Sequence, residues 1–340
     1  MIRIAAEEAW ASVSILKRYK SLLEAKPASW DPGFRSLWGF FLGSAPRATQ
    51  LVTRIQDLGA QRIADMDASG IARQIVFLTS PGVQVFDAKE GTAIAKETND
   101  ELAEKISLFK NRYAALAAIA PQEPGNAVKE LQRATARLGF KGAVVNSHTQ
   151  GEYLDDPKYW EIFEAAEALD VPIYLHPNTP PPRMIEPFLP RGLDGAIYGF
   201  AVETGLHLMR IVVGGVFDRF PKLRLVVGHL GEGLPFWLFR LDFMHRSMVA
   251  SARYEGAKPL KKKPSDYLKE NVWVTTSGMQ WEPAILFCLS VLGPGRVMYA
   301  MDYPYQFVPE EVKVTDELAV PDSVKREIYQ STAEKVFRLP

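Results

Sequence analysis

Acidic and imidazole side chains stand at the ends of short apolar runs in three distant parts of this chain. Glu7 ends IRIAAE, His176 ends VPIYLH, and Asp302 ends RVMYAMD. Carboxylate oxygens and imidazole nitrogens bind divalent cations, and three such ligands leave positions open for water or a substrate. If the three runs end at one edge of a fold, these residues predict a site for a single metal ion.

The stretch HLGEGLP, residues 229–235, places His229 and Glu232 three residues apart at another such end. A carboxylate beside an imidazole raises its basicity and fixes its tautomer, so the pair is a candidate acid or base; a structural hydrogen bond is the other interpretation. Of the remaining histidines, His148 is ambiguous, His207 has the apolar neighbours of a structural residue, and His245 is expected at a surface or interface.

The elements that would position these residues are eight apolar runs separated by amphipathic segments. The runs are apolar almost throughout instead of alternating, which is typical of parallel strands buried on both faces. Helical patterns with ordinary start and stop residues lie between them. The runs cover residues 2–7, 74–80, 113–120, 141–148, 171–176, 223–229, 271–277 and 296–302, and the helical patterns cover 47–70, 98–112, 126–140, 159–170, 203–220 and 282–293.

This alternation predicts an α/β protein with one domain, residues 1–340, folded as a (β/α)8 TIM barrel. A doubly wound open sheet is the alternative, but no glycine-rich turn follows the first strand. Two connections are long, residues 177–202 after the fifth strand and 230–270 after the sixth, and such insertions usually form a lid or a subunit contact. Active sites of these barrels lie at the carboxyl ends of the strands, where the candidate ligands stand.

Aromatic side chains are expected around the same mouth of the barrel. A flat aromatic substrate would be bound by such side chains together with a few polar groups. The candidates are Trp10, Trp38, Phe200, Trp281, Tyr303 and Tyr305.

The charge balance argues against a nucleic-acid partner, because Lys+Arg and Asp+Glu number 40 each and the formal net charge is +0. The single cysteine, Cys288, excludes an intrachain disulfide, which fits a reducing compartment. The N-terminus lacks the pattern of a signal peptide, and no uncharged stretch is long enough to cross a bilayer. We therefore expect a cytoplasmic protein without nucleic-acid or membrane partners.

These residues occur within longer stretches that resemble the decarboxylase branch of the amidohydrolase superfamily, and within it the carboxyvanillate decarboxylases. The resemblance covers nearly the whole chain and includes both insertions. The stretches that carry it are IAAEEAWAS, SLWGF, RATQ, RIADMDASGI, LTSPGVQ, GFKGAVVNSHTQG, YLHP, GLDGAIYGFAVETGLHLMR, VVGHLGEGLPFWLFRLDFMH, RYEGAKPLKK, TTSG and VMYAMDYPYQ.

The resemblance implies that Glu7, His176 and Asp302 hold one divalent metal. Many members of the superfamily open with a His-x-His pair, and binuclear relatives end the fourth strand on a carboxylated lysine. Here residues 7–9 read Glu-Glu-Ala and no lysine ends that strand, so a single metal is implied. Mn²⁺ is the expected metal, Zn²⁺ is the alternative, and no organic cofactor is expected.

The implied reaction is the non-oxidative loss of CO₂ from an ortho-hydroxylated aromatic acid. Direct loss would leave an unstable aryl anion, whereas an ionised ortho hydroxyl pushes electron density onto the carboxylated carbon, which is protonated before the C–C bond breaks. The metal would act as Lewis acid and template, and the phenol serves as its own electron sink. Asp302 is the candidate proton donor, and His229 with Glu232 is the second candidate.

A charged substrate needs cationic partners, and guanidinium groups bind a carboxylate through two parallel hydrogen bonds. The resemblance implies Arg47 as one such residue and Arg253, in the second insertion, as another that reaches the site of a neighbouring subunit. Tyr305 is expected to hydrogen-bond the phenol side, and His176 to contact substrate as well as metal. The long insertions favour a homodimer or homotetramer.

The resemblance thus implies the decarboxylation of 5-carboxyvanillate to vanillate. Alternatives that keep the reaction have 2,3-dihydroxybenzoate, gamma-resorcylate or salicylate as substrate. Two alternatives change the reaction: a metal-dependent hydrolase such as a lactonase on the same barrel, and an aromatic-acid binding protein without turnover.

Overall fold

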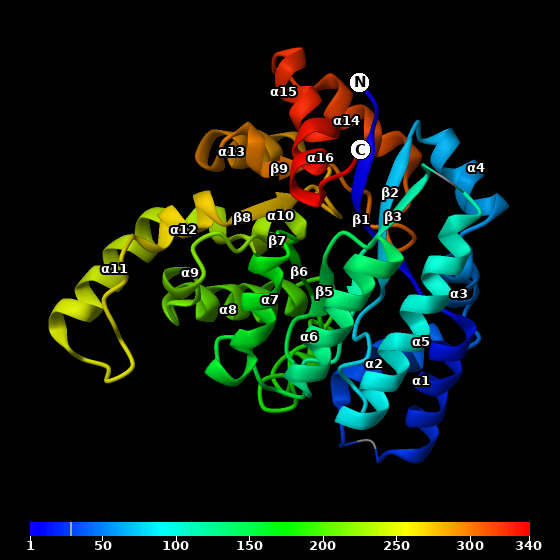
Figure 1. Ribbon diagram of the computed structural model, residues 1–340, viewed down its shortest axis with the longest axis horizontal. Helices are drawn as coiled ribbons and strands as arrows, with labels where there is room; N and C mark the ends of the chain where they lie inside the picture. Colours follow the sequence, from blue (N-terminus) through cyan, green and yellow to red (C-terminus); the bar gives the residue numbers. More distant parts are fainter. Residues whose placement is uncertain (28, 110) are drawn as a thin grey trace.

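Short parallel strands form the centre of the molecule and helices surround them (Figure 1). The computed structural model describes residues 1–27, 29–109 and 111–340. Strands β1, β2 and β3 form one parallel sheet in chain order. Strands β4 to β9 form a second parallel sheet, also in chain order. The strands are β1 (Ile4–Trp10), β2 (Arg73–Leu78), β3 (Tyr113–Ala115), β4 (Ala117–Ala118), β5 (Ala143–Asn146), β6 (Ile173–His176), β7 (Leu225–Val227), β8 (Val272–Thr275) and β9 (Val297–Met298).

The two sheets are parts of one barrel, because β3 and β4 are two halves of a single predicted strand. Between these halves, Leu116 N–H donates to Val76 O at 3.0 Å on one side. Ala117 N–H donates to Gly142 O at 2.8 Å on the other side. The segment therefore joins β2 to β5 although the ladder is interrupted at Leu116.

The barrel closes between its first and last strands. Ala6 N–H donates to Tyr299 O at 2.9 Å, and Ala9 N–H donates to Tyr303 O at 2.8 Å. β9 itself ends at Met298, so the residues after it continue along β1 as irregular backbone. Eight strand positions in chain order confirm the predicted (β/α)8 barrel.

Helices cover the outside of the barrel (Figure 1), and none in the described part of the chain is long and apolar enough to cross a membrane. They are α1 (Val13–Ala25), α2 (Pro32–Phe41), α3 (Pro46–Gln56), α4 (Ala60–Ala68), α5 (Ala88–Ser107), α6 (Pro124–Arg133), α7 (Trp160–Ala168), α8 (Gly199–Val213), α9 (Val216–Arg219), α10 (His229–Glu232), α11 (Leu238–Ser251), α12 (Pro264–Glu270), α13 (Glu282–Leu292), α14 (Val312–Glu317), α15 (Asp322–Arg326) and α16 (Thr332–Phe337).

Three of the predicted helices differ in extent from the structure. The helix predicted over 98–112 is α5, which begins ten residues earlier, at Ala88. The segment 47–70 forms α3 and α4, which are separated where the Asp57 side chain accepts hydrogen bonds from the N–H groups of Gly59 and Arg62. The segment 203–220, whose pattern is broken only by glycines, forms α8 and α9, which separate where Gly215 has the left-handed φ of 80°. Helices α1 and α2, which follow β1, were not predicted from the sequence.

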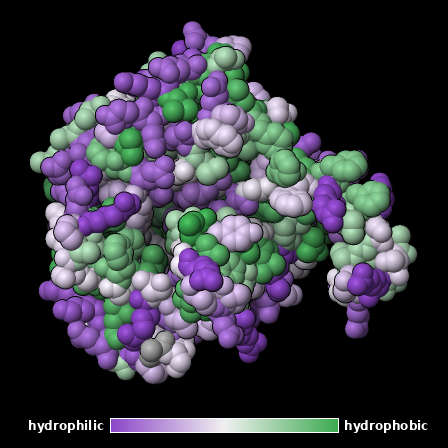
Figure 2. Space-filling model, turned by 180° about the vertical axis from the view of Figure 1, so that it is seen from behind, coloured by the Kyte–Doolittle hydropathy of each residue, from purple (hydrophilic) through white to green (hydrophobic). Residues whose placement is uncertain are grey.

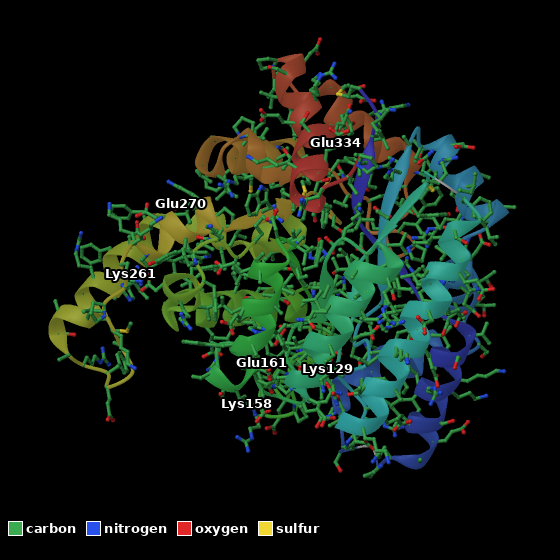
Figure 3. All side chains as sticks on the ribbon, in the orientation of Figure 1. Lys129, Lys158, Glu161, Lys261, Glu270 and Glu334 are labelled. Atoms are coloured by element: carbon green, nitrogen blue, oxygen red, sulfur yellow. The ribbon has the colours of Figure 1, made fainter. Side chains whose placement is uncertain are left out.

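Charged residues lie on the outer faces of these helices (Figure 3). Lys129 on α6 and Glu161 on α7 are labelled there, as is Lys158 just before α7. Lys158 Nζ pairs with Glu152 at 2.6 Å, and both side chains are about half exposed. The barrel interior is apolar by contrast, so the acidic and imidazole groups inside it stand out as candidates for function.

The two long connections have different structures. The first begins with a buried extended segment, residues 177–181, that packs against α2 near Gly33. The second contains α11 and α12 and projects from the body as an arm, drawn in yellow in Figure 1 and seen from behind in Figure 2. The carboxyl ends of the strands and the first connection enclose the site described next.

Candidate metal centre and active site

Glu7 lies inside the barrel where β1 carries one extra residue. The register of β1 against β2 shifts between Ala5 and Glu8, and a bulge of this kind changes the direction of the side chains within it. Glu7 is 1% exposed. Its Oε2 accepts hydrogen bonds from Thr275 Oγ1, at 2.6 Å, and from the Tyr174 hydroxyl.

The other oxygen of Glu7 has no partner. Oε1 is buried without a hydrogen bond, and it faces Nε2 of His176 at 3.5 Å and Nε2 of His229 at 3.8 Å. His176 Nδ1 lies 3.0 Å from Pro177 O and can only donate to that carbonyl, which leaves the lone pair on Nε2. A buried carboxylate oxygen beside a nitrogen lone pair is the arrangement that a cation satisfies.

His229 is fixed by the turn that follows β7. Its Nδ1 is 2.7 Å from Glu232 Oε1, so the predicted pair is in contact. The preceding residue is Gly228, and a Cβ there would lie 2.7 Å from Glu7 Oε2. The chain therefore needs glycine at this point to bring His229 beside Glu7.

Asp302 stands four residues beyond β9 with φ 66°, in the left-handed region. For a residue other than glycine such backbone is strained by about 1–3 kcal/mol and persists only where its surroundings impose it. A Cβ on Gly278 would lie 3.6 Å from Asp302 Oδ2 and 3.3 Å from His229 Cδ2. The two side chains therefore approach the same point from β7 and β9.

This donor set fits one divalent cation in its chemistry. Two carboxylates, one of which has the orphaned buried oxygen, and two imidazoles converge from the ends of four different strands. No three His, Cys, Asp or Glu side chains in the described ranges already stand at the spacing of a complete ligand shell. The candidate ligands are therefore neighbours, not a preformed shell.

Burial and charge act together on the pKa values of the cluster. Burial lowers the pKa of His176 to about 4, although the charge of Glu7 opposes this. Burial also disfavours charged His229, but Glu232 and Glu7 outweigh it and raise the pKa of His229 to about 10. Burial raises the pKa of Asp302 to about 8, against the positive charge of His229. Three carboxyl groups thus crowd around one imidazole, and a divalent cation bound among them would stabilise the ionised form of Asp302.

A cavity of about 310 Å³ opens above the cluster. Its size suits a single substituted ring better than an extended ligand. His176, His229 and Asp302 line it together with Leu37, Phe40, Phe41, Arg47, Leu51, Thr79, Ser80, Ala196, Phe200, Tyr305 and Gln306. A second cavity of about 380 Å³, between α1 and residues 81–90, contains none of the candidate ligands.

The predicted aromatic lining is correct in part. Phe200 and Tyr305 line the cavity. Trp10, Trp38 and Tyr303 are buried in the core instead, and Trp281 is exposed on the surface. Phe40 and Phe41 at the end of α2 complete the lining and were missed, because nothing in the sequence predicted that α2 would fold over the mouth.

The predicted substrate-binding residues have different positions. Arg47 is in the first turn of α3 at the cavity and makes no ion pair with any residue that the structure describes. The Tyr305 hydroxyl lies 2.6 Å from Thr79 Oγ1 and borders the same space. Arg253 follows α11 on the exposed arm, with its guanidinium over the ring of Tyr254, and does not line the cavity of its own chain.

The other histidines are structural or peripheral. His207 Nε2 accepts a hydrogen bond from Leu154 N–H at 2.9 Å, so Nδ1 carries the proton toward Ser147 Oγ, 3.1 Å away. Both ring nitrogens of His148 are bonded to backbone groups, at 2.9 and 3.1 Å. The structural interpretation of His207 is correct, and the same interpretation holds for His148. His245 is partly exposed on the arm.

The burial of His207 leads to a prediction about the stability of the protein at low pH. Burial lowers its pKa from 6.5 to about 3, so the folded protein cannot take up the proton that the unfolded chain binds below pH 6.5. The free energy of unfolding should therefore be unaffected by this group above pH 6.5 and decrease between 6.5 and 3, by up to about 5 kcal/mol. Urea unfolding of the wild type and of His207→Gln at several pH values measures the contribution. If the free energy of unfolding changes with pH in the same way for both proteins, the contribution of His207 is refuted.

Several residues around the site were missed in the sequence. Tyr174 could have been found, because it lies two residues before His176 and so on the same face of the strand. Thr275, whose hydroxyl donates to Glu7 Oε2, was also missed. Glu8 and Arg62 are fully buried charged residues behind Asp302.

Comparison with known proteins gives a consistent result. In structure, the chain matches the 5-carboxyvanillate decarboxylase of Novosphingobium aromaticivorans, complexed with manganese and 4-hydroxy-3-methoxy-5-nitrobenzoic acid, with a TM-score of 0.97 and 49% identity over 99% of this chain and 96% of that one. The 5-carboxyvanillate decarboxylase of Sphingomonas paucimobilis matches with a TM-score of 0.93 and 36% identity over 100% and 99% of the chains.

A relative in sequence is the gamma-resorcylate decarboxylase of Rhodococcus jostii, which is 35% identical over 85% of this chain and 90% of its own length. Residues 52–339 match the amidohydrolase family. The match spans the barrel from α3 to the C-terminal helices and includes three of the four side chains of the cluster. The chain therefore belongs to the amidohydrolase family.

Proposed function

We propose that this chain is a Mn²⁺-dependent, non-oxidative decarboxylase of an ortho-hydroxylated aromatic acid, with 5-carboxyvanillate as substrate and vanillate as product. The observation that carries the proposal is the convergence of Glu7, His176, His229 and Asp302 below an aromatic-lined cavity. The relatives named above are decarboxylases of aromatic acids, and the solved structure from Novosphingobium holds manganese. Zn²⁺ is the alternative metal, and no organic cofactor is required.

Glu7, His176 and Asp302 are the proposed metal ligands. Glu7 Oε1 and His176 Nε2 are the atoms left for a metal, since the other polar atoms of both side chains are engaged inside the barrel. When bound, the cation would supply Lewis-acid stabilisation to the phenolate and carboxylate of the substrate. His176 also borders the cavity, so it would contact the substrate as well.

Asp302 is the proposed proton carrier. It takes the proton of the ortho hydroxyl and delivers it to the carboxylated ring carbon, which gives a dienone. The C–C bond then breaks, its electron pair restores the aromatic ring, and CO₂ leaves. The phenolate product takes a proton from solvent, so one proton is consumed for each CO₂ released. His229 with Glu232 is the second candidate donor.

Arg47 is the proposed partner of a substrate carboxylate. Its guanidinium reaches the cavity and is available, since it is not engaged by any carboxylate that the structure describes. Tyr305, oriented by its bond to Thr79, is proposed to hydrogen-bond the phenol side. Phe41 and Phe200 would pack on the ring faces.

The test is CO₂ release from protein stripped of metal and reloaded with Mn²⁺ or Zn²⁺. The substrates compared are 5-carboxyvanillate, 2,3-dihydroxybenzoate, gamma-resorcylate and salicylate. We expect the highest kcat/KM with 5-carboxyvanillate and loss of turnover on chelation. Release of no CO₂ from any of these acids would contradict the proposal, and hydrolysis of a lactone would support the hydrolase alternative.

Glu232 is predicted to matter through its bond to His229. Glu232→Gln keeps a hydrogen-bond acceptor but removes the charge, so kcat is expected to decrease about 10–100-fold, as for other residues that orient an active-site histidine. Steady-state kinetics measure this. The matched control is Glu152→Gln, which alters a carboxylate bonded to Lys158 and Tyr159 at the surface and should leave kcat unchanged. Equal kcat values for Glu232→Gln and the wild type would exclude a role for the pair.

We propose that the arm joins two copies of the chain as a homodimer, which could pair further as a tetramer. Large apolar side chains are exposed along η4 (Leu234–Trp237) and α11, and hydrophobic surface is visible on the arm in Figure 2. Surface of this kind is usually covered by a partner. The side chains are Phe236, Trp237, Phe239, Phe243 and Met244. Arg253 follows α11 on this arm. We propose that in the dimer it reaches the site of the neighbouring subunit and binds substrate there.

A charge on the arm should therefore separate the subunits. Phe239, 84% exposed in the isolated chain, becomes costly to bury once replaced by glutamate, so Phe239→Glu is expected to be monomeric. Light scattering during size-exclusion chromatography measures the mass. Leu108→Glu, at a side chain 75% exposed on the end of α5, is the matched control and should keep the wild-type mass. A wild type that elutes at 38.0 kDa would refute the dimer.

We also propose that the chain forms a single domain and that it is located in the cytoplasm. Residues 1–340 form one domain, because the barrel seam joins the first strand to residues 299–303. A cytoplasmic location is supported by the single cysteine, Cys288, which is free and buried.

A further inference from the structure

Glu8 follows the proposed metal ligand Glu7 but has different partners. It is fully buried, and its carboxylate lies at the seam between β1 and the segment after β9. Oε1 accepts the N–H of Met301 at 3.0 Å, and Oε2 accepts the N–H of Tyr303 at 3.0 Å. One side chain thus holds the two backbone amides on either side of Asp302.

This contact replaces regular strand pairing. β9 ends at Met298, and Asp302 has the left-handed φ of 66°, which a continuing strand would not allow. On the opposite side of the segment, the N–H of Ala300 is held by Thr276 Oγ1 at 3.0 Å. The backbone around Asp302 is therefore fixed from β1 and from the residue that follows β8, and not by its own conformational preference.

A buried network supports the carboxylate of Glu8. Gln74 Nε2 approaches Oε2 at 3.4 Å, and Arg62 Nε donates to Gln74 Oε1 at 2.8 Å. The Arg62 guanidinium, fully buried, lies 4.1 Å from the ring centroid of Tyr303 and supplies the compensating positive charge. Burial raises the pKa of Glu8, but the amide of Met301 and the charge of Arg62 oppose that shift and favour the ionised carboxylate. Since both oxygens accept an N–H, the bonded geometry is that of the ionised group.

We infer that Glu8 is a positioning residue, which sets the backbone of Asp302 so that its carboxylate faces the metal site. The inference rests on the proposed function, because it assigns Asp302 a role as ligand and proton carrier. The bulge in β1 gives the two successive glutamates separate tasks: Glu7 points into the barrel and Glu8 points to its seam. Neither glutamate can perform the task of the other.

The test replaces Glu8 with glutamine, which has nearly the same shape. A glutamine has one acceptor oxygen, so its NH₂ group would face one of the two amides and repel it. In metal-free protein, hydrogen–deuterium exchange over residues 299–306 is expected to become at least tenfold faster. The dissociation constant for Mn²⁺, measured from the free-ion electron paramagnetic resonance signal, is expected to rise about 10–100-fold.

The matched control is Glu130→Gln. Glu130 is also buried and accepts hydrogen bonds from Asn99 and Arg133, but it lies on α6 away from the cavity. This variant should change neither the exchange of residues 299–306 nor the affinity for Mn²⁺. Glu8→Asp keeps the charge opposite Arg62 but is too short to reach both amides, so it should show an intermediate exchange rate and serves if Glu8→Gln does not fold.

The two hypotheses fail in different ways. Unchanged exchange at residues 299–306 in folded Glu8→Gln and Glu8→Asp would overturn the positioning role, whatever the enzyme does. A wild type that binds Mn²⁺ but releases no CO₂ would refute the proposed function, while the exchange comparison and the affinity for Mn²⁺, which need no turnover, would still decide the role of Glu8. Faster exchange with an unchanged affinity for Mn²⁺ would also overturn the inference, because Glu8 would then act on the loop alone.

Discussion

Replacing Asp302 with asparagine is expected to lower kcat for decarboxylation by about 10³-fold or more while the protein remains folded. Asparagine retains the shape of the side chain and one oxygen, but it cannot accept the phenol proton and pass it to carbon. Positioned proton transfer typically contributes 10²–10⁴ in rate, and the loss of a charged metal ligand adds to the defect. Steady-state kinetics with 5-carboxyvanillate, at saturating Mn²⁺, measure the effect.

The control for this variant is Asp65→Asn. Asp65 is a buried carboxylate that accepts the Tyr303 hydroxyl at 2.8 Å, but it does not border the cavity. The Asp65→Asn variant should lower the free energy of unfolding and should change kcat only slightly. If Asp302→Asn keeps more than a tenth of the wild-type kcat, Asp302 is not the proton carrier, and His229→Asn becomes the variant that identifies the donor.

The second large effect is expected on metal binding, from Glu7→Gln. The orphaned Oε1 of Glu7 is the buried atom with no other partner, and the amide of glutamine would present either a neutral oxygen or an N–H to the metal. Affinity for Mn²⁺ should decrease by more than the 10–100-fold typical of an outer-shell change, and activity should decrease with it. Calorimetric titration of metal-free protein with Mn²⁺ gives the dissociation constant.

Two further results would complete the assignment of Glu7. The control, Glu130→Gln, removes a buried carboxylate elsewhere and should bind Mn²⁺ as the wild type does. Thermal unfolding of metal-free Glu7→Gln should show no large loss of stability, because the substitution removes an unsatisfied buried charge. An unchanged Mn²⁺ affinity would show that the metal does not bind at this cluster.

The barrel could be predicted because its strands are buried on both faces and so are apolar without interruption. The ends of these runs also identified the cluster, since parallel strands in one barrel end on the same rim. Glu7, His176, His229 and Asp302 come from four separate runs and meet within a small space. Their positions at the ends of these runs were sufficient to predict that they lie on one rim of the barrel.

The sequence did not show which of two successive residues in β1 points into the barrel. Whether Glu7 or Glu8 faces the barrel interior depends on the extra residue in β1, which is fixed by pairing with β2, about 70 residues away. Fully buried Arg62 was missed for the same kind of reason, because its partners Gln74 and Ala9 become neighbours only in the folded barrel. The pattern of apolar residues in a helix indicates its buried face. It does not indicate which charged residue on that face has a hydrogen-bond partner in the folded protein.

The residues that line the cavity were predicted least well. Phe40 and Phe41 reach the cavity because α2, in the connection after β1, folds over the mouth. Arg253 was expected at the site of a neighbouring subunit; it lies on the arm, outside the cavity of its own chain, and its role there stays a prediction. Connections carry no periodic pattern that fixes their direction, so side chains on them cannot be placed from sequence.

The most direct test of the central claim is a single reaction in D₂O with 5-carboxyvanillate labelled with ¹³C in the carboxylate next to the hydroxyl. Nuclear magnetic resonance follows the label and the aromatic protons. The account predicts one labelled CO₂ or bicarbonate per vanillate formed, one deuterium at the ring carbon that carried the carboxylate, and no reaction after chelation. Unreacted substrate in the presence of Mn²⁺, or vanillate that carries hydrogen instead of deuterium at that carbon, would contradict it.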